Sequence, residues 1–222
     1  MKKIYWCSKQ TEEKLEAEEA EGGEEEQQFI FLGGPEGPQM PNQHIDVMDN
    51  TIMFYGEVND QNAMTLNKAI RGIDKDLQIF QVKYGAEPPP IKLYINSPGG
   101  SIFAGLSIVD TIKNSKIPVH TYIDGSACSA ATLISCVASK RFMFEHSFML
   151  IHQLRTGMWG KFEEFKDEME NLEMFMDRIR DIYLKNSKMS KKQVTDFLKR
   201  EKYFDAKTCL ELGLIDEIVT NG

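Results

Sequence analysis

The sequence lacks long apolar runs and an excess of basic residues, and each absence excludes a class of protein. None of its 222 residues lie in an apolar stretch of about 18, the length needed to cross a membrane. The opening "MKKIYWCSKQ" has no apolar core, so we expect no signal peptide. The formal net charge of −8 argues against nucleic acid or an anionic membrane as a partner.

Cysteine is also scarce, and its spacing argues against disulfide and metal chemistry. The four cysteines form no CxxC pair and no zinc-like pattern, and HExxH is absent. Two of them lie in an apolar stretch, where we expect small buried hydrophobic side chains. This usage is typical of a reducing cytoplasm, and we expect neither a metal nor a bound cofactor. The cysteines are Cys7, Cys128, Cys136 and Cys209.

Composition divides the chain into two parts. Residues 8–28 carry nine glutamates and almost nothing to bury, which predicts a disordered acidic tail. A processed or partner-binding arm is the alternative. A Gly/Pro-rich linker follows, so we predict an acidic N-terminal segment over 1–42 and a folded domain over 43–222.

Strand and helix patterns alternate from residue 43 onward. This alternation predicts an α/β domain with parallel strands. The expected strands are 51–58, 91–95, 118–123, 141–144 and 148–152, and the expected helices are 59–76, 102–116 and 125–139.

The C-terminal part has a different pattern. Residues 160–187 predict one long helix with an apolar stripe at steps of three and four and charge on its other faces. The stripe fits either core packing or contact with another subunit. A second helix is expected after Ser190, and a last helix ends at Gly213 before a terminal strand.

Three motifs could carry chemistry. "NSPGGS" (96–101) joins a strand to a helix, where glycines permit an oxyanion hole, a phosphate cradle or an ordinary turn. In "DGSACSAAT" both Ser126 and Ser129 lie near an expected helix start, as nucleophile candidates or as capping and packing residues. "FMLIHQ" ends an apolar strand with His152, either a general base or a structural histidine.

Taken together, "YINSPGG", "GSACSAA" and "MLIHQ" closely resemble the proteolytic subunits of the Clp protease family (ClpP). The similarity extends over about residues 44–219. It implies a ClpP/crotonase-like ββα superhelix in which 160–187 is a protruding handle helix. It also implies a serine endopeptidase that hydrolyses peptide bonds of unfolded proteins or peptides.

The resemblance assigns roles to individual residues. Ser129 would be the nucleophile and His152 the general base, while the backbone NH groups of Gly100 and Ala130 would form the oxyanion hole. Ser126 stands where the family commonly has glutamine, which removes it as nucleophile. Glu201 stands where the family usually has the aspartate of the triad, and Asp205 and Asp196 rank below it as substitutes.

The resemblance further implies an assembly of two stacked heptameric rings, joined through the handle helices, with an AAA+ ATPase as a possible partner. Substrate peptides would lie extended along the strand edge near 149–156. The chain departs from the family in "SAA" after the nucleophile position, in a longer 77–90 segment and in the region before residue 43. Two alternatives follow: a catalytically weak or inactive structural subunit of a Clp-type ring, or, ranked below it, a crotonase acting on acyl-CoA.

Overall fold

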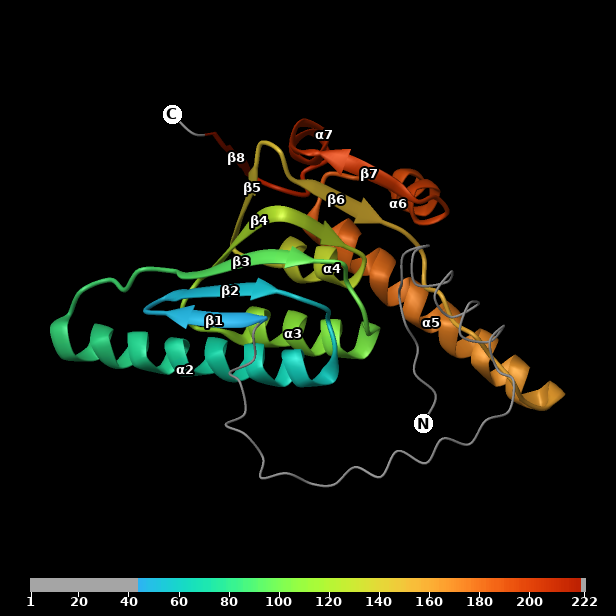
Figure 1. Cartoon of the computed structure of the whole chain (residues 1–222), viewed down its shortest axis with the longest axis horizontal. Helices are drawn as coiled ribbons and strands as arrows, with labels where there is room; N and C mark the ends of the chain where they lie inside the picture. Colours follow the sequence, from blue (N-terminus) through green and yellow to red (C-terminus); the bar gives the residue numbers. More distant parts are fainter. Residues whose placement is uncertain (1–43, 221–222) are drawn as a thin grey trace, which may run out of the picture.

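The computed structural model describes residues 44–220, which form one mixed α/β fold around an eight-stranded sheet (Figure 1). The strands are β1 (Ile45–Met48), β2 (Thr51–Tyr55), β3 (Ile91–Ser97), β4 (Val119–Cys128), β5 (Lys140–Phe144), β6 (Phe148–Ile151), β7 (Lys202–Asp205) and β8 (Glu217–Val219). The helices are α2 (Asp60–Tyr84), α3 (Ile102–Asn114), α4 (Ala130–Cys136), α5 (Phe162–Asn186), α6 (Lys191–Leu198) and α7 (Ala206–Glu211). The α/β class predicted from the sequence is confirmed.

The sheet is mostly parallel and has the order β1-β2-β3-β4-β5-β8. Strands β2, β3, β4, β5 and β8 run parallel, and only β1 joins this row antiparallel. The ten-residue β4 has two partners on its second edge. Its first half pairs with β5 and its last three residues pair with β6, which in turn pairs antiparallel with β7. This fork carries the end of β4 away from β5 and places it against β6.

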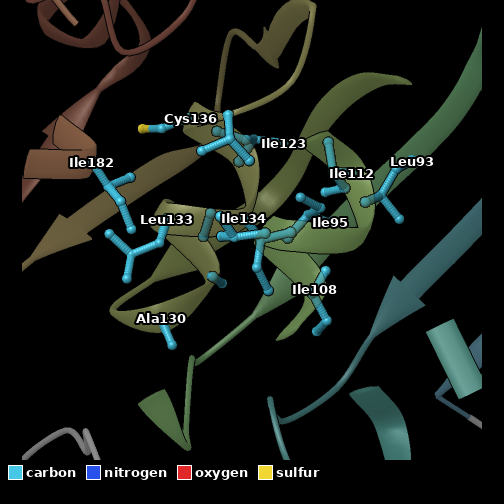
Figure 2. Close-up of a cluster of buried hydrophobic side chains, with 14 of the residues drawn as sticks. Leu93, Ile95, Ile108, Ile112, Ile123, Ala130, Leu133, Ile134, Cys136 and Ile182 are labelled. Carbon is cyan, nitrogen blue, oxygen red and sulfur yellow. The ribbon is translucent and has the colours of Figure 1, made fainter. Parts of the chain in front are cut away.

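Alternation along the central strands builds the core. In β3 the side chains of Ile91, Leu93 and Ile95 are fully buried, whereas Lys92 and Tyr94 on the other face are partly exposed. Helices α2, α3 and α4 cover the apolar face (Figure 1). All seven residues of α4 are buried, and Figure 2 shows its side chains packed among those of β3, α3, β4 and α5. Helix α4 is therefore a fully internal helix.

The opposite face of the central strands carries an aromatic row. The Tyr94 and Tyr122 rings stack at a centroid distance of 4.7 Å, and the Tyr122 and Phe142 rings stack at 4.6 Å. The Lys140 ammonium lies 4.7 Å from the Phe142 ring centroid. These contacts run across β3, β4 and β5, which are adjacent in the sheet.

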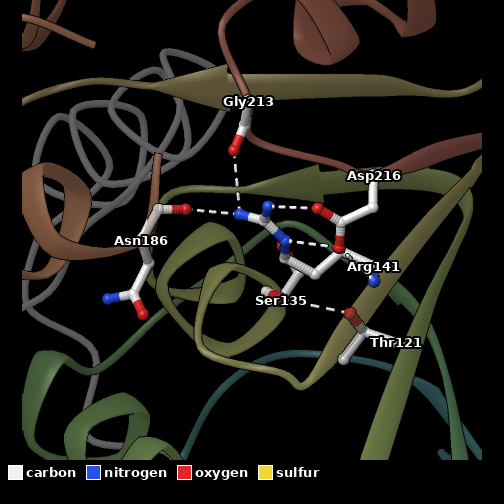
Figure 3. Close-up of polar contacts among 6 residues, drawn as sticks. All are labelled: Thr121, Ser135, Arg141, Asn186, Gly213 and Asp216. Carbon is white, nitrogen blue, oxygen red and sulfur yellow. Dashed lines mark hydrogen bonds and ion pairs between the residues drawn. The ribbon is translucent and has the colours of Figure 1, made fainter. Parts of the chain in front are cut away.

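Arg141 on β5 holds the C-terminal elements to the sheet. Its guanidinium binds both carboxylate oxygens of Asp216 and donates to the backbone oxygens of Asn186 and Gly213 (Figure 3). The hydrogen bonds from Arg141 lower the pKa of Asp216. The end of α5 and the chain before β8 are thereby held to β5.

Helix α5 matches the helix predicted over 160–187, and the structure distinguishes between the two uses foreseen for its apolar stripe. Only Ile179, Ile182 and Tyr183 are buried, all in its C-terminal half. Phe162 and Met169 in the other half are 72% and 57% exposed. Figure 1 shows this half projecting beyond the sheet. Only the C-terminal half of the stripe is core.

Two predicted boundaries were wrong. The helix expected over 59–76 continues to Tyr84, where Gly85 caps it in the left-handed conformation. The helix expected over 125–139 begins only at Ala130, because residues 126–128 pair with β6 and Ala127 also pairs with Ser97 of β3. Pairing on both sides outweighs the local preferences of these small residues. Strands β1 and β7 were not predicted.

Two expectations remain: the acidic N-terminal segment and the absence of a membrane-spanning helix. The predicted acidic segment 1–42 lies outside the described residues. Within 44–220, no helix is both long and apolar enough to cross a membrane.

Candidate active site

Ser129 lies at the junction between β4 and α4, in an unusual backbone conformation. Its φ of 61° and ψ of −128° belong to a region that side chains with a Cβ rarely adopt. Such a conformation costs about 1–3 kcal/mol and persists only where neighbouring contacts impose it. The residue is fully buried, and within the described chain its Oγ has no hydrogen-bond partner.

Contacts from three directions impose this conformation. The Ser129 NH donates to the Leu150 carbonyl of β6 at 2.8 Å. The Ser129 carbonyl accepts from Thr132 Oγ1 at 2.6 Å, and that hydroxyl also lies 2.5 Å from the Tyr183 hydroxyl of α5. Tyr183 is fully buried, and burial raises the pKa of its phenol. The serine is therefore held by β6, α4 and α5 together.

The glycine turn after β3 forms the next wall. A Cβ on Gly99 would lie 2.5 Å from the Ser129 Cβ and 2.6 Å from the Cys128 carbonyl oxygen, and φ at Gly99 is 93°. Only glycine fits there. The turn is braced by the Gly99 NH, which donates to the Ser97 Oγ at 3.1 Å.

Gly100 and Ala130 present their amides near this serine. In the parallel bridge of Val58 with Gly100, Val58 bonds to the Gly99 carbonyl and to the Ser101 NH. Because successive amides along an extended chain alternate in direction, the Gly100 NH faces away from Val58. The Ala130 NH is in the first turn of α4, where no intrahelical acceptor exists.

His152 follows the last residue of β6 and is only 3% exposed. Because β4 and β6 run parallel and pair as far as Cys128 and Leu150, Ser129 and His152 both follow the same end of this strand pair. Burial and then the nearby Arg155 guanidinium lower the pKa of His152 to about 4, against a smaller raising effect of the Gln153 backbone. The imidazole is therefore neutral at pH 7, the form that accepts a proton.

Glu201 immediately precedes β7. The antiparallel pairing of Ile151 with Lys202 places Glu201 across from His152 at the next position of the register. Its carboxylate forms an ion pair with Arg155. The two acidic substitutes lie elsewhere: Asp205 is at the far end of β7 and caps α7 through the Thr208 NH, and Asp196 is exposed on α6.

The other serine candidate has a structural role. Ser126 lies in β4, and both its backbone NH and its hydroxyl donate to the Asn96 side-chain oxygen, at 3.3 and 3.2 Å. Asn96 in turn lies over Gly125, where a Cβ would come within 2.8 Å of the amide nitrogen. Ser126 therefore helps to join β3 to β4.

The predicted substrate edge needs a correction. Residues 149 and 150 pair with β4 on one side, and residues 149–151 pair with β7 on the other, so these strand edges are already in use. A peptide cannot add a strand there. Of the predicted range 149–156, only the part from His152 onward lies outside the sheet.

Sequence reasoning missed three residues of this site. Gly99 was seen as part of the turn, but its contact with Ser129 depends on tertiary packing. Tyr183 belongs to the apolar stripe of α5, and the sequence pattern gives no sign that its hydroxyl contacts Thr132. Arg155 could have been noticed in the sequence, because it is a cation three residues after His152, the candidate base.

These residues together can support acyl transfer. A hydroxyl on a strained turn, a neutral buried imidazole after the neighbouring strand and backbone amides without strand or helix partners are the components of that chemistry. Residues 44–220 contain no cluster of three or more His, Cys, Asp or Glu side chains that could hold a metal ion.

Comparisons with known proteins agree on one family. The Clp protease family model matches residues 43–222. The ATP-dependent Clp protease proteolytic subunit of Lactococcus lactis is 35% identical over 177 residues, covering 78% of this chain and 84% of the relative. Proteolytic subunit 1 of Rhodopirellula baltica is 30% identical over 176 residues, covering 78% of this chain and 74% of the relative.

A solved structure agrees with these relatives. A point mutant of ClpP1 from Listeria monocytogenes superposes with a TM-score of 0.68 and 26% sequence identity, covering 78% of this chain and 92% of that chain. The family model spans the whole described fold, and the two relatives are 35% and 30% identical to this chain. The chain belongs to the Clp protease family.

Proposed function

We propose that this chain is a serine endopeptidase that cleaves unfolded proteins or peptides. Family membership supports a peptidase, and the observation that carries the serine mechanism is Ser129 itself. Its strained backbone and its buried Oγ without a hydrogen-bond partner are both unfavourable for stability. A residue that combines a strained backbone with an unsatisfied buried hydroxyl is typical of a functional site.

Ser129 Oγ attacks the scissile carbonyl carbon while His152 accepts the hydroxyl proton. The tetrahedral intermediate collapses as His152 returns that proton to the leaving amine, which leaves an acyl-enzyme ester on Ser129. Water then attacks the ester with His152 again as base. The acid product departs and the serine hydroxyl is restored.

The backbone NH groups of Gly100 and Ala130 stabilise the oxyanion in this mechanism. Two amides fixed by the glycine turn and by the first turn of α4 need no reorganisation when the charge develops. Glu201 would be the third member, which is supported by the β6–β7 ladder ending at Ile151 and Lys202, the neighbours of His152 and Glu201 in sequence. It would orient the imidazole and stabilise the imidazolium.

We further propose that the chain works in the cytoplasm as a ring-shaped oligomer of two stacked heptamers. The apolar side chains on the projecting half of α5, including Phe162, Phe165 and Met169, are 43% to 72% exposed. A second ring would cover them. An AAA+ ATPase is the expected partner for unfolding substrates, and native mass determination tests the stoichiometry.

Labelling with a fluorophosphonate tests the nucleophile. The intact chain should form one adduct, and Ser129→Ala should abolish both the adduct and peptide cleavage, with a loss of about 10⁴-fold or more. Ser126→Ala is the matched control, because this serine lies three residues before Ser129, in β4, and its loss should leave labelling intact. An adduct that survives Ser129→Ala would refute the assignment.

The alternative with structural support is an inactive subunit of a Clp-type ring, since Glu201 is engaged by Arg155. That alternative predicts no adduct on the folded, assembled chain. The same labelling experiment therefore separates the two functions.

A further inference from the structure

Arg155 lies at the active site but has no part in the mechanism above. It follows His152 by three residues, and its guanidinium forms an ion pair with Glu201. The two side chains are 24% and 35% exposed, so the pair is only partly screened by water. The resemblance that assigned the triad gave no role to this arginine.

The position of Glu201 gives its carboxylate two competing cations. His152 and Glu201 are the residues just beyond Ile151 and Lys202, the last pair of the β6–β7 ladder, and the ion pair joins Glu201 to Arg155. The guanidinium carries its charge at every pH of interest, whereas the imidazole is positive only while it holds the serine proton. The permanent cation therefore binds the carboxylate more persistently.

We propose that Arg155 is a positioning residue that holds the Glu201 carboxylate and thereby limits how far Glu201 stabilises the imidazolium of His152. The proposal rests on the proposed function of Ser129 and His152 as a peptidase pair. Two effects act in the same direction: the arginine occupies the carboxylate, and its own positive charge opposes a second positive charge on the imidazole.

Other titratable groups near His152 come from two neighbouring elements. At the end of β4 there is Cys128, whose thiol has a pKa raised by burial. At the start of β7 there are Lys202 and Tyr203, with Glu201 directly before them, and the pKa of Tyr203 is also raised, mainly by burial. Among these groups Glu201 is the one carboxylate that could stabilise the imidazolium. Its ion pair with Arg155 therefore has the largest influence on the charge of His152.

The first test needs no enzymatic activity. The His152 titration is followed by NMR in the full-length chain, with the resonance assigned from the spectrum of His152→Gln. Arg155→Gln should raise the His152 pKa by about one unit or more, because the guanidinium no longer opposes a positive charge on the imidazole. One pKa unit corresponds to about 1.4 kcal/mol. Arg155→Lys, which keeps the charge, should give a much smaller change.

Lys202→Gln is the matched control, because it removes a positive charge next to Glu201 from an exposed side chain. It should move the His152 pKa much less than Arg155→Gln does. An unchanged pKa in Arg155→Gln, or an equal change in Lys202→Gln, would overturn the proposal.

The second test is a double-mutant cycle on cleavage of a short fluorogenic peptide. Arg155→Gln should raise kcat about tenfold, and Glu201→Gln should then cost about tenfold in that background but only about twofold in the original chain. Equal costs in both backgrounds, or a kcat that falls in Arg155→Gln and recovers in Arg155→Lys, would contradict the role. Failure of Ser129 labelling would refute the peptidase, whereas the NMR titration would still decide the role of Arg155.

Discussion

Two neighbouring strand-to-helix connections meet at the candidate active site, and they are built from different residues. The β3–α3 connection uses glycines where φ is positive, at 93° for Gly99 and 144° for Gly100. The β4–α4 connection places Ser129 at a φ of 61°. Both connections need backbone conformations that suit glycine, yet only the first one has glycine.

The difference follows from space and chemistry. At Gly99 any Cβ would overlap Ser129, so the residue type is fixed by packing. At Ser129 a side chain fits, and glycine would relieve the strain. The chain nevertheless carries a hydroxyl there. The first turn is thus explained by sterics alone, whereas the second is explained only by a use for the hydroxyl.

The largest effect is expected from closing the space beside Ser129. Gly99→Ala should lower the free energy of unfolding by about 3 kcal/mol or more, because its Cβ would overlap the Ser129 Cβ and the Cys128 carbonyl oxygen and because φ is positive there. Gly72→Ala is the control: this exposed α2 glycine has nothing within 4 Å of a new Cβ. It should gain up to about 1 kcal/mol. Urea unfolding measures both, and a loss below about 1 kcal/mol for Gly99→Ala would contradict the steric account.

The next effect concerns His152, the buried neighbour of the serine turn. The folded chain keeps it neutral down to a pKa of about 4, whereas the unfolded chain protonates it near 6.5. Between these values the unfolded state binds the extra proton. Stability should therefore fall by about 1.4 kcal/mol per pH unit as the pH drops from 6.5 toward 4.

Denaturation at pH 7 and pH 5 measures this dependence. His152→Gln should flatten it, while the same substitution at the exposed His146 should not. Equal pH dependence in the starting chain and in His152→Gln would show that His152 is not held neutral by burial.

The smallest effect sharpens the contrast between the two turns. Ser129→Gly should be more stable than Ser129→Ala by about 1 kcal/mol, since glycine relieves the positive φ and alanine does not. The same pair of substitutions at Ser101, whose φ is −57°, should not favour glycine. Thermal and urea unfolding compare the four variants. If Ser129→Gly is no more stable than Ser129→Ala, the serine backbone is not strained.

Much of the fold could be predicted because local patterns carried it. Alternating apolar residues in β3 and the capping Ser190 of α6 need only their neighbours in sequence. The end of α2 and the start of α4 were predicted wrongly for opposite reasons. Helix α2 continues to Tyr84, beyond its expected end, as an exposed helix. Helix α4 begins later than expected, because the residues before it pair with two strands.

The sequence by itself determined the family and the candidate residues, because "YINSPGG", "GSACSAA" and "MLIHQ" are contiguous motifs. Only the tertiary structure decided how these residues are held. The contact of Ser129 with Gly99 joins residues 30 apart in sequence, the ion pair of Glu201 with Arg155 joins residues 46 apart, and the strain at Ser129 depends on a contact from β6. Such contacts depend on strand register and burial, which short-range patterns do not encode.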